Sequence, residues 1–167
     1  MRSVVLIPTY NEIDSLPTAL DRVRSAAVQA HILVIDDNSP DGTGDLADAR
    51  AQDDDHIHVL HRTEKNGLGP AYLAGFKWAL ENDFELVIEM DADGSHRAED
   101  LALLIQRAEM ADKPDLVIGS RWISGGATQG WSQKRVLLSR AGNVYINLAL
   151  GLNVRDATAG FRVYRAD

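Results

Sequence analysis

The chain has 167 residues and a formal net charge of −8, with 45% hydrophobic residues, 25% charged residues and no cysteine. This length fits one domain, and the composition excludes a disordered, collagen-like or coiled-coil protein. The acidic charge argues against nucleic acid as a partner, because phosphate-backbone binding relies on an excess of Lys and Arg. The lack of cysteine excludes disulfides, thiolate zinc sites and a cysteine nucleophile.

Short apolar runs alternate with longer helical patterns along the chain. The runs are rich in Val, Ile and Leu, as parallel strands covered on both faces are, and comprise residues 4–7, 32–35, 57–60, 86–90 and 116–118. Apolar stripes predict helices through Leu73, Phe76, Lys77 and Leu80, through Leu101, Leu104, Ile105 and Ala108, and over 132–150 behind an N-cap at Ser132. The alternation predicts an open α/β sheet whose ligands bind beyond the carboxyl ends of the strands.

Several common nucleotide-binding and hydrolytic motifs do not occur. Gly67-Leu68-Gly69 lacks the third glycine of a dinucleotide-binding turn, and the chain has no Walker lysine motif, HExxH or GxSxG. No apolar run approaches the roughly 18 residues of a membrane span. Dehydrogenase, P-loop, hydrolase and membrane-spanning interpretations are therefore not supported.

The most informative polar cluster is a D-x-D sequence directly after the fourth apolar run. In extended chain the side chains of Asp91 and Asp93 point to the same side, so they can meet at the end of the strand. Two carboxylates can hold a hard divalent cation that also binds phosphate oxygens. A simple turn at Asp93-Gly94 is the alternative, and the position at the strand end favours the cation site.

Two further polar segments follow the first and second apolar runs. Tyr10 and Glu12 offer an aromatic ring for a base and a carboxylate for ribose hydroxyls. The adjacent Asp36 and Asp37 repel each other unless one of them meets a cation, a base or a hydroxyl. Helix capping and turn formation explain residues 39–43 equally well.

Positive charges follow the third and fifth apolar runs. Arg62 and Lys65 can supply positive charge to the sheet edge, although solvated surface charge explains Arg62 equally well. Arg121 follows the fifth run directly. Arg135 and Ser139 are four residues apart, so they share a helix face near its amino end, where a phosphate monoester also meets the helix dipole. A basic helix lying on anionic lipid is the competing interpretation.

Six segments occur in the order of a known family: PTYNE at 8–12, DDNSPDGT at 36–43, KNGLGPAY at 65–72, MDADGSH at 90–96, GSRW at 119–122 and DATAGFR at 156–162. Together they resemble the family 2 glycosyltransferases, specifically the dolichol- or polyprenol-phosphate mannose synthases. The resemblance implies a GT-A fold, an α/β three-layer architecture with a mostly parallel central sheet. It also implies a single domain over 1–167 that lacks the C-terminal segments of the family.

The resemblance assigns roles to eleven residues. It places the nucleoside at Pro8, Tyr10, Glu12, Ile35 and Asp37, the diphosphate and its Mg²⁺ or Mn²⁺ at Asp91, Ala92 and Asp93, and the acceptor phosphate at Arg121, Arg135 and Ser139. Asp91, Asp93 and Arg121 are the implied catalytic residues. Some relatives carry Gln as a third metal ligand where Ser95 stands here, so we expect water in that position.

The implied reaction is a metal-dependent, inverting transfer of mannose from GDP-mannose to a polyprenyl monophosphate. We expect a cytoplasmic protein, peripheral to the cytoplasmic face of the membrane, that approaches lipid through Lys134, Arg135 and Arg140 with Trp122 and Trp131 at the interface. UDP-glucose or another nucleotide sugar as donor, and a nucleotide-sugar-binding module without turnover, remain alternatives. A nucleotidylyltransferase is disfavoured because its Gly-rich, Lys-bearing first loop is absent. No pattern indicates an oligomeric state.

Overall fold

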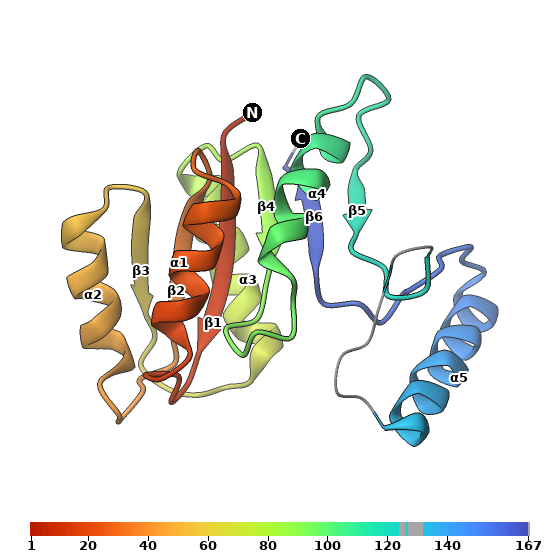
Figure 1. Cartoon of the computed structure of the whole chain (residues 1–167), viewed down its shortest axis with the longest axis horizontal. Coiled ribbons are helices and arrows are strands. Elements are labelled where there is room, and N and C mark those ends of the chain that lie inside the picture. The colour runs from red at the N-terminus through yellow and green to blue at the C-terminus, as the bar shows by residue number, and fades with distance from the viewer. Residues whose placement is uncertain (124–125, 127–131, 167) are drawn as a thin grey trace.

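In the computed structural model, which describes residues 1–123, 126 and 132–166, six strands form one sheet (Figure 1). The strands are β1 (Ser3–Thr9), β2 (His31–Asp36), β3 (Ile57–His61), β4 (Leu86–Glu89), β5 (Leu116–Ile118) and β6 (Arg162–Arg165). Their order is β3-β2-β1-β4-β6-β5, with β1 to β4 parallel. Strand β6 pairs antiparallel with both β4 and β5, so β5 runs in the same direction as β4. The mostly parallel sheet is confirmed.

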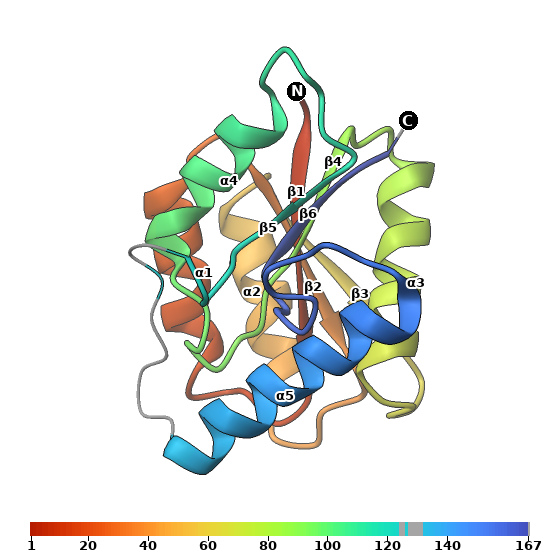
Figure 2. The same ribbon diagram turned by 90° about the vertical axis from the view of Figure 1, so that its right-hand side faces the viewer.

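Helices cover both faces of the sheet, which gives the three-layer α/β arrangement expected of the GT-A fold (Figure 2). The helices are α1 (Leu16–Ala26), α2 (Thr43–Asp53), α3 (Leu68–Glu81), the short 3₁₀ helix η1 (Ala98–Asp100), α4 (Leu101–Ala108) and α5 (Gln133–Leu150). Alternate residues of β1 supply the two cores: Val5 and Ile7 pack on the side of α1, α2 and α4, and Val4 and Leu6 pack on the side of α3.

The helix predicted around residues 73–80 exists, but its predicted buried face is wrong. Leu73 and Leu80 are 70% and 56% exposed, and the buried face carries Ala71, Tyr72, Gly75 and Ala79. A Cβ at Gly75 would lie 2.6 Å from Ile35 Cδ1 and 2.9 Å from Leu6 Cδ1. At Gly75 helix α3 therefore lies very close to the sheet, and Leu73 and Leu80 point outward. The aromatic rings of Tyr72, Phe76 and Trp78, by contrast, pack against the core on this side.

Helix α4 follows its predicted stripe, with Leu101 and Ala108 buried and Leu104 and Ile105 partly buried against the same core. Helix α5 also begins as predicted, since Ser132 caps it by accepting a hydrogen bond from Arg135 N at 3.4 Å.

The packing of α5 differs from that of the other helices. It buries none of its residues, and it stands apart from the sheet layers (Figure 1). Leu137, Leu138 and Leu148 are 70%, 75% and 80% exposed. In the described part of the chain, no helix combines the length and the apolar character that crossing a membrane requires.

Candidate functional site

The carboxyl ends of β1, β2 and β4 border a pocket of about 320 Å³, which we call the donor pocket. Its lining residues are Pro8, Thr9, Tyr10, Glu12, Asp37, Lys65, Gly67, Leu68, Ala71, Asp91, Ala92 and Asp93. The structure thus brings together all the residues expected to hold the donor except Ile35. The Ile35 side chain is 0% exposed in the core under α3, because side chains along a strand alternate and that position faces the helix.

The adjacent Asp36 and Asp37 have separate partners. Asp36 accepts hydrogen bonds from Ser39 N at 3.1 Å and Ser39 Oγ at 2.5 Å, so it closes the turn after β2. Asp37 forms an ion pair with Arg62 at 2.5 Å. The Arg62 side chain is only 15% exposed, so surface solvation does not explain this residue. Arg62 instead compensates the charge of Asp37 at the edge of the donor pocket.

Tyr10 and Glu12 are held at the mouth of the donor pocket by neighbouring side chains. Lys65 Nζ lies 3.7 Å from the centre of the Tyr10 ring, a cation–π contact that joins the loop after β3 to the loop after β1. The Glu12 backbone N–H donates to Thr43 Oγ1 at 3.0 Å, and the Glu12 carboxylate accepts a hydrogen bond from Ser15 Oγ. These contacts fix the loop that carries both candidate nucleoside-binding groups.

Two side chains, Tyr72 and His96, make three contacts with Asp91. Tyr72 Oη donates to Asp91 Oδ1 at 3.2 Å, and burial raises the pKa of Tyr72, which keeps the phenol protonated as a donor. The Asp91 backbone N–H donates to His96 Nδ1 at 3.0 Å. His96 Nε2 lies 3.8 Å from Asp91 Oδ2.

Asp93 is held as a carboxylate. Burial acts to raise the pKa of Asp93, but hydrogen bonds from Ser95, one of them at 2.9 Å from the Ser95 backbone N–H, and the positive charge of Arg135 are among the effects that outweigh burial and lower the pKa. Among the described residues no cluster of three or more His, Cys, Asp or Glu side chains is placed to hold a metal ion. Two carboxylates fit a hard divalent cation whose other ligands are diphosphate and water oxygens.

Two of the three expected acceptor residues meet through Thr158. Arg121 donates to the buried Asp156 from Nε at 2.8 Å and from Nη2 at 2.6 Å, and to Thr158 Oγ1 at 2.8 Å. Burial acts to raise the pKa of Asp156, but the hydrogen bonds from Arg121 outweigh it and lower the pKa. Ser139 Oγ lies 3.4 Å from Thr158 Oγ1. This network joins the end of β5, helix α5 and the loop before β6.

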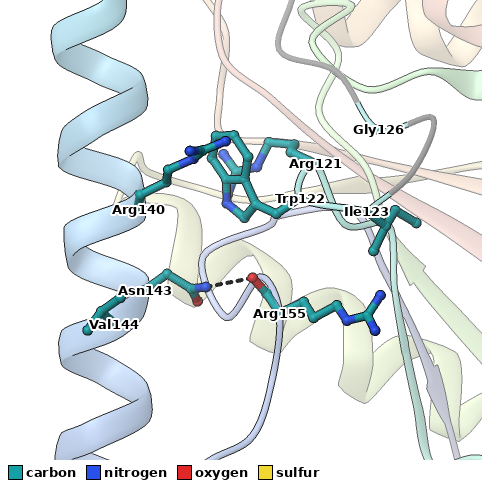
Figure 3. A pocket seen from close by; sticks show the side chains of 8 residues that line it. All are labelled: Arg121, Trp122, Ile123, Gly126, Arg140, Asn143, Val144 and Arg155. Carbon is teal, nitrogen blue, oxygen red and sulfur yellow. Dashed lines mark hydrogen bonds between the residues drawn. The ribbon is translucent and has the colours of Figure 1, made fainter.

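A second pocket, of about 640 Å³, lies between α5 and the segment after β5, and we call it the acceptor pocket (Figure 3). It is lined by Arg121, Trp122, Ile123, Gly126, Arg140, Asn143, Val144 and Arg155. Arg140 lies over the Trp122 ring, 4.8 Å from its centre. Cationic and apolar side chains both line this pocket, which suits an anion attached to an apolar chain, and Arg121 is the one expected acceptor residue among its described lining residues. Trp131, expected at the membrane interface, lies outside the described residues.

Sequence reasoning missed the supporting roles of Tyr72, His96, Asp156 and Thr158. All four lie inside the segments that carry the family resemblance. The sequence therefore indicated the segments, but it did not show which residues these four side chains contact. Tyr72 and Asp91 are 19 residues apart, and Arg121 and Asp156 are 35 apart. No local spacing rule connects residues at such separations, because the sheet brings them together.

Comparison with known proteins identifies the family of this chain. Residues 4–167 match the family model described as glycosyl transferase family 2. The chain is 54% identical over 167 residues to the undecaprenyl-phosphate mannosyltransferase of Micrococcus luteus, covering 100% of this chain and 68% of that protein. It is 50% identical over 167 residues to the polyprenol monophosphomannose synthase of Mycolicibacterium smegmatis, covering 99% of this chain and 62% of that protein. The chain thus spans about two thirds of the length of these relatives.

Solved structures show the same fold. The mannosyltransferase PcManGT of Pyrobaculum calidifontis, solved in complex with GDP-Man and Mn²⁺, matches 70% of this chain and 34% of its own, with a TM-score of 0.60 and 25% identity. S. aureus TarS 1–349 matches 99% of this chain and 47% of its own, with a TM-score of 0.57 and 17% identity. With its GT-A fold and its match to the family model over nearly its whole length, the chain belongs to glycosyl transferase family 2 and is a glycosyltransferase.

Proposed function

We propose that the protein transfers mannose from GDP-mannose to a polyprenyl monophosphate with the help of Mg²⁺ or Mn²⁺. Relatives at 54% and 50% identity are named for mannosyl transfer to such lipids, and PcManGT was solved with GDP-Man and Mn²⁺. The observation that carries the proposal is that one loop contacts both sides of the site. Asp156 holds the Arg121 guanidinium by two hydrogen bonds, and four residues later a Cβ at Gly160 would lie 4.0 Å from Asp91 Oδ2.

The donor pocket would hold the nucleotide by three kinds of contact. Tyr10 offers a ring for the base, and Glu12 and Asp37 offer carboxylates for hydroxyls and base N–H groups. Asp91 and Asp93 would hold the cation beside the diphosphate, with Ala92 between them. When bound, the cation offsets the negative charge that develops on the departing nucleoside diphosphate.

The acceptor needs orientation more than deprotonation. The second pKa of a phosphate monoester is about 6, so the acceptor is already a nucleophilic anion at pH 7. Asp156 fixes the plane of the Arg121 guanidinium, and Arg135 and Ser139 lie in the first turns of α5, where the helix dipole also favours an anion. A direct attack opposite the departing diphosphate would invert the anomeric configuration of mannose.

The surface of α5 supports the proposed peripheral position at a membrane, which we place at its cytoplasmic face. Its exposed leucines lie on the same helix as Lys134, Arg135 and Arg140. Such a helix can lie along the headgroups of a membrane while its basic side chains meet anionic phosphates. The acceptor pocket, which borders α5, would then open toward the lipid that carries the acceptor phosphate.

The test is a transfer assay with GDP-mannose or UDP-glucose, a short polyprenyl phosphate, and Mg²⁺, Mn²⁺ or EDTA. We expect a mannosylated lipid only with GDP-mannose and a divalent cation, and NMR of the product should show inverted anomeric configuration. Transfer from UDP-glucose alone would establish the other donor. Metal-dependent GDP-mannose binding without any product would establish a nucleotide-sugar-binding module.

A further inference from the structure

We propose that His96 is a positioning residue for Asp91, and that the loop before β6 holds His96 in place through Gly160 and Phe161. The proposal rests on the proposed function, because it takes Asp91 as a ligand of the cation. It assigns a role to the segment 156–162 beyond its contact with Arg121. One loop would then support both the metal side and the acceptor side of the site.

His96 contacts Asp91 at two points. Its Nδ1 accepts a hydrogen bond from the Asp91 backbone N–H at 3.0 Å, and its Nε2 lies 3.8 Å from Asp91 Oδ2. Because Nδ1 is the acceptor, the proton of the neutral ring is on Nε2, facing the carboxylate. The ring thus restrains both the backbone and the side chain of Asp91, as partners of a ligand often do in metal sites.

The loop before β6 surrounds the His96 ring. The Phe161 ring, which belongs to a side chain only 5% exposed, stacks on His96 with 5.3 Å between centres and 15° between planes. Gly160 lies at the edge of the ring: a Cβ there would be 3.3 Å from His96 Cε1, 3.4 Å from Nε2 and 4.0 Å from Asp91 Oδ2. Glycine at this position therefore leaves the ring the space it needs.

The loop is anchored on its other side by the acceptor network. Asp156, which is 0% exposed, accepts the Arg121 backbone N–H at 2.9 Å as well as its side chain. Four residues later the same loop passes Gly160. Displacing the loop would move Arg121 and His96 together, so the loop can couple the orientation of the acceptor guanidinium to that of Asp91.

The decisive variant is Gly160→Ala, with Gly142→Ala as its matched control. Gly160 does not have the left-handed backbone conformation that excludes alanine, so its added methyl acts mainly by pushing the His96 ring a few tenths of an ångström. A methyl at Gly142, in α5, has no neighbour within 4 Å. The readout is Mn²⁺ affinity in the presence of GDP, measured by electron paramagnetic resonance. Nitrogen-15 NMR of the imidazole serves as a second readout.

We expect Gly160→Ala to weaken Mn²⁺ binding about threefold and His96→Ala about tenfold, the lower end of the effect of removing a partner of a metal ligand. His96→Asn should recover most of the loss, because its carboxamide oxygen can accept the Asp91 N–H. Gly142→Ala should match the parent. In the parent, NMR should show the neutral ring protonated on Nε2.

Two results would overturn the inference. Equal Mn²⁺ affinities for the parent and Gly160→Ala, or a neutral His96 ring protonated on Nδ1, would remove His96 as a positioning residue while leaving the proposed function intact. A parent protein that binds GDP without any dependence on Mn²⁺ or Mg²⁺ would overturn the proposed function, and this inference with it. Thermal unfolding of each variant shows whether it is folded under the conditions of the Mn²⁺ titration, so that a weaker affinity is not mistaken for a loss of folding.

Discussion

The donor side and the acceptor side of this protein are built in different ways. The donor pocket lies on the ends of β1, β2 and β4, strands whose side chains are almost fully buried, and Asp36, Asp37 and Asp91 each have defined partners. The acceptor pocket borders α5, which buries no residue and exposes its leucines. A small charged donor can be held by a rigid rim, whereas a lipid acceptor needs a surface that reaches apolar surroundings.

The difference in packing can be tested with two glycines, Gly75 in α3 on the donor side and Gly142 in α5 on the acceptor side. Gly142→Ala in α5 should raise stability by about 0.5–1 kcal/mol, because alanine favours the helix and meets no neighbour. Gly75→Ala in α3 should instead cost about 3 kcal/mol, because its Cβ would lie 2.6 Å from Ile35 Cδ1. Urea unfolding of both variants measures the contrast. A stabilised Gly75→Ala protein would show that α3 does not pack closely on the sheet.

The metal dependence of the donor side can be tested at Asp93. Asp93→Asn should weaken GDP-mannose binding roughly a hundredfold when Mn²⁺ or Mg²⁺ is present, because it removes one of the two carboxylates proposed to hold the cation. In EDTA the variant and the parent should bind alike. Calorimetric titration in both conditions provides the comparison. Equal donor affinity of the parent with and without metal would contradict the metal role.

The acceptor side should respond separately from the donor side. Arg135→Ala and Ser139→Ala should raise the acceptor KM or lower turnover about ten- to a hundredfold, since each removes one contact with a phosphate, worth roughly 1.5–3 kcal/mol when charge-assisted. Donor affinity should remain nearly unchanged. Gly142→Ala, in the same helix and with no neighbour within 4 Å of its added methyl, is a control for a general change in the helix. An unchanged acceptor response in both variants would place the phosphate elsewhere, with Arg121 the next candidate.

The end of the sheet opposite the donor pocket carries a histidine whose burial makes stability depend on pH. Burial, with the neighbouring charges of His56 and His58, lowers the pKa of His31 to about 4 from 6.5. Between pH 6.5 and about pH 4, His31 is therefore protonated in the unfolded chain but neutral in the folded chain. The free energy of unfolding thus falls as the pH drops through this range. Because solvent screens the partly exposed ring, the free energy of unfolding at pH 5 should be lower than at pH 7 by about 1 kcal/mol.

Urea midpoints at pH 7 and pH 5 measure this loss. His31→Phe keeps an aromatic ring beside Phe84 but cannot titrate, so its midpoint should change less between the two values. His61→Gln, at an exposed residue paired with Asp48, is the control and should follow the parent. A parent midpoint that does not change with pH would contradict the lowered pKa, because it would mean that His31 has the same protonation state in the folded and the unfolded chain.

The smallest effect is expected for membrane contact through α5. Lys134, Arg135 and Arg140 each contribute about 1 kcal/mol at most near an anionic surface, and salt screens this attraction. The protein should sediment little with neutral vesicles and bind vesicles that contain anionic lipid or polyprenyl phosphate, with binding lost at about 0.5 M salt. Tight, salt-resistant binding to neutral vesicles would instead indicate an apolar anchor, for which the exposed leucines of α5 are the first candidates.

The sequence alone was enough to predict the α/β class, the positions of the parallel strands and the edge of the sheet that carries the polar segments. These features depend on local patterns: Val4 to Ile7 and Ile32 to Ile35 are continuous apolar runs, and Asp91 and Asp93 directly follow another. The cap at Ser132 is equally local, because its partner is the N–H of Arg135.

Tertiary structure decided the rest, because it depends on residues far apart in the chain. The buried face of α3 is set by the closeness of Gly75 to Leu6 and Ile35, so the larger leucines of that helix point outward, contrary to the predicted stripe. The antiparallel strand β6 enters between β4 and β5 and brings Asp156 to Arg121 and Phe161 to His96. Periodicity reports which residues of one element share a face, but the depth of packing and the partner across the sheet depend on how all elements fit together.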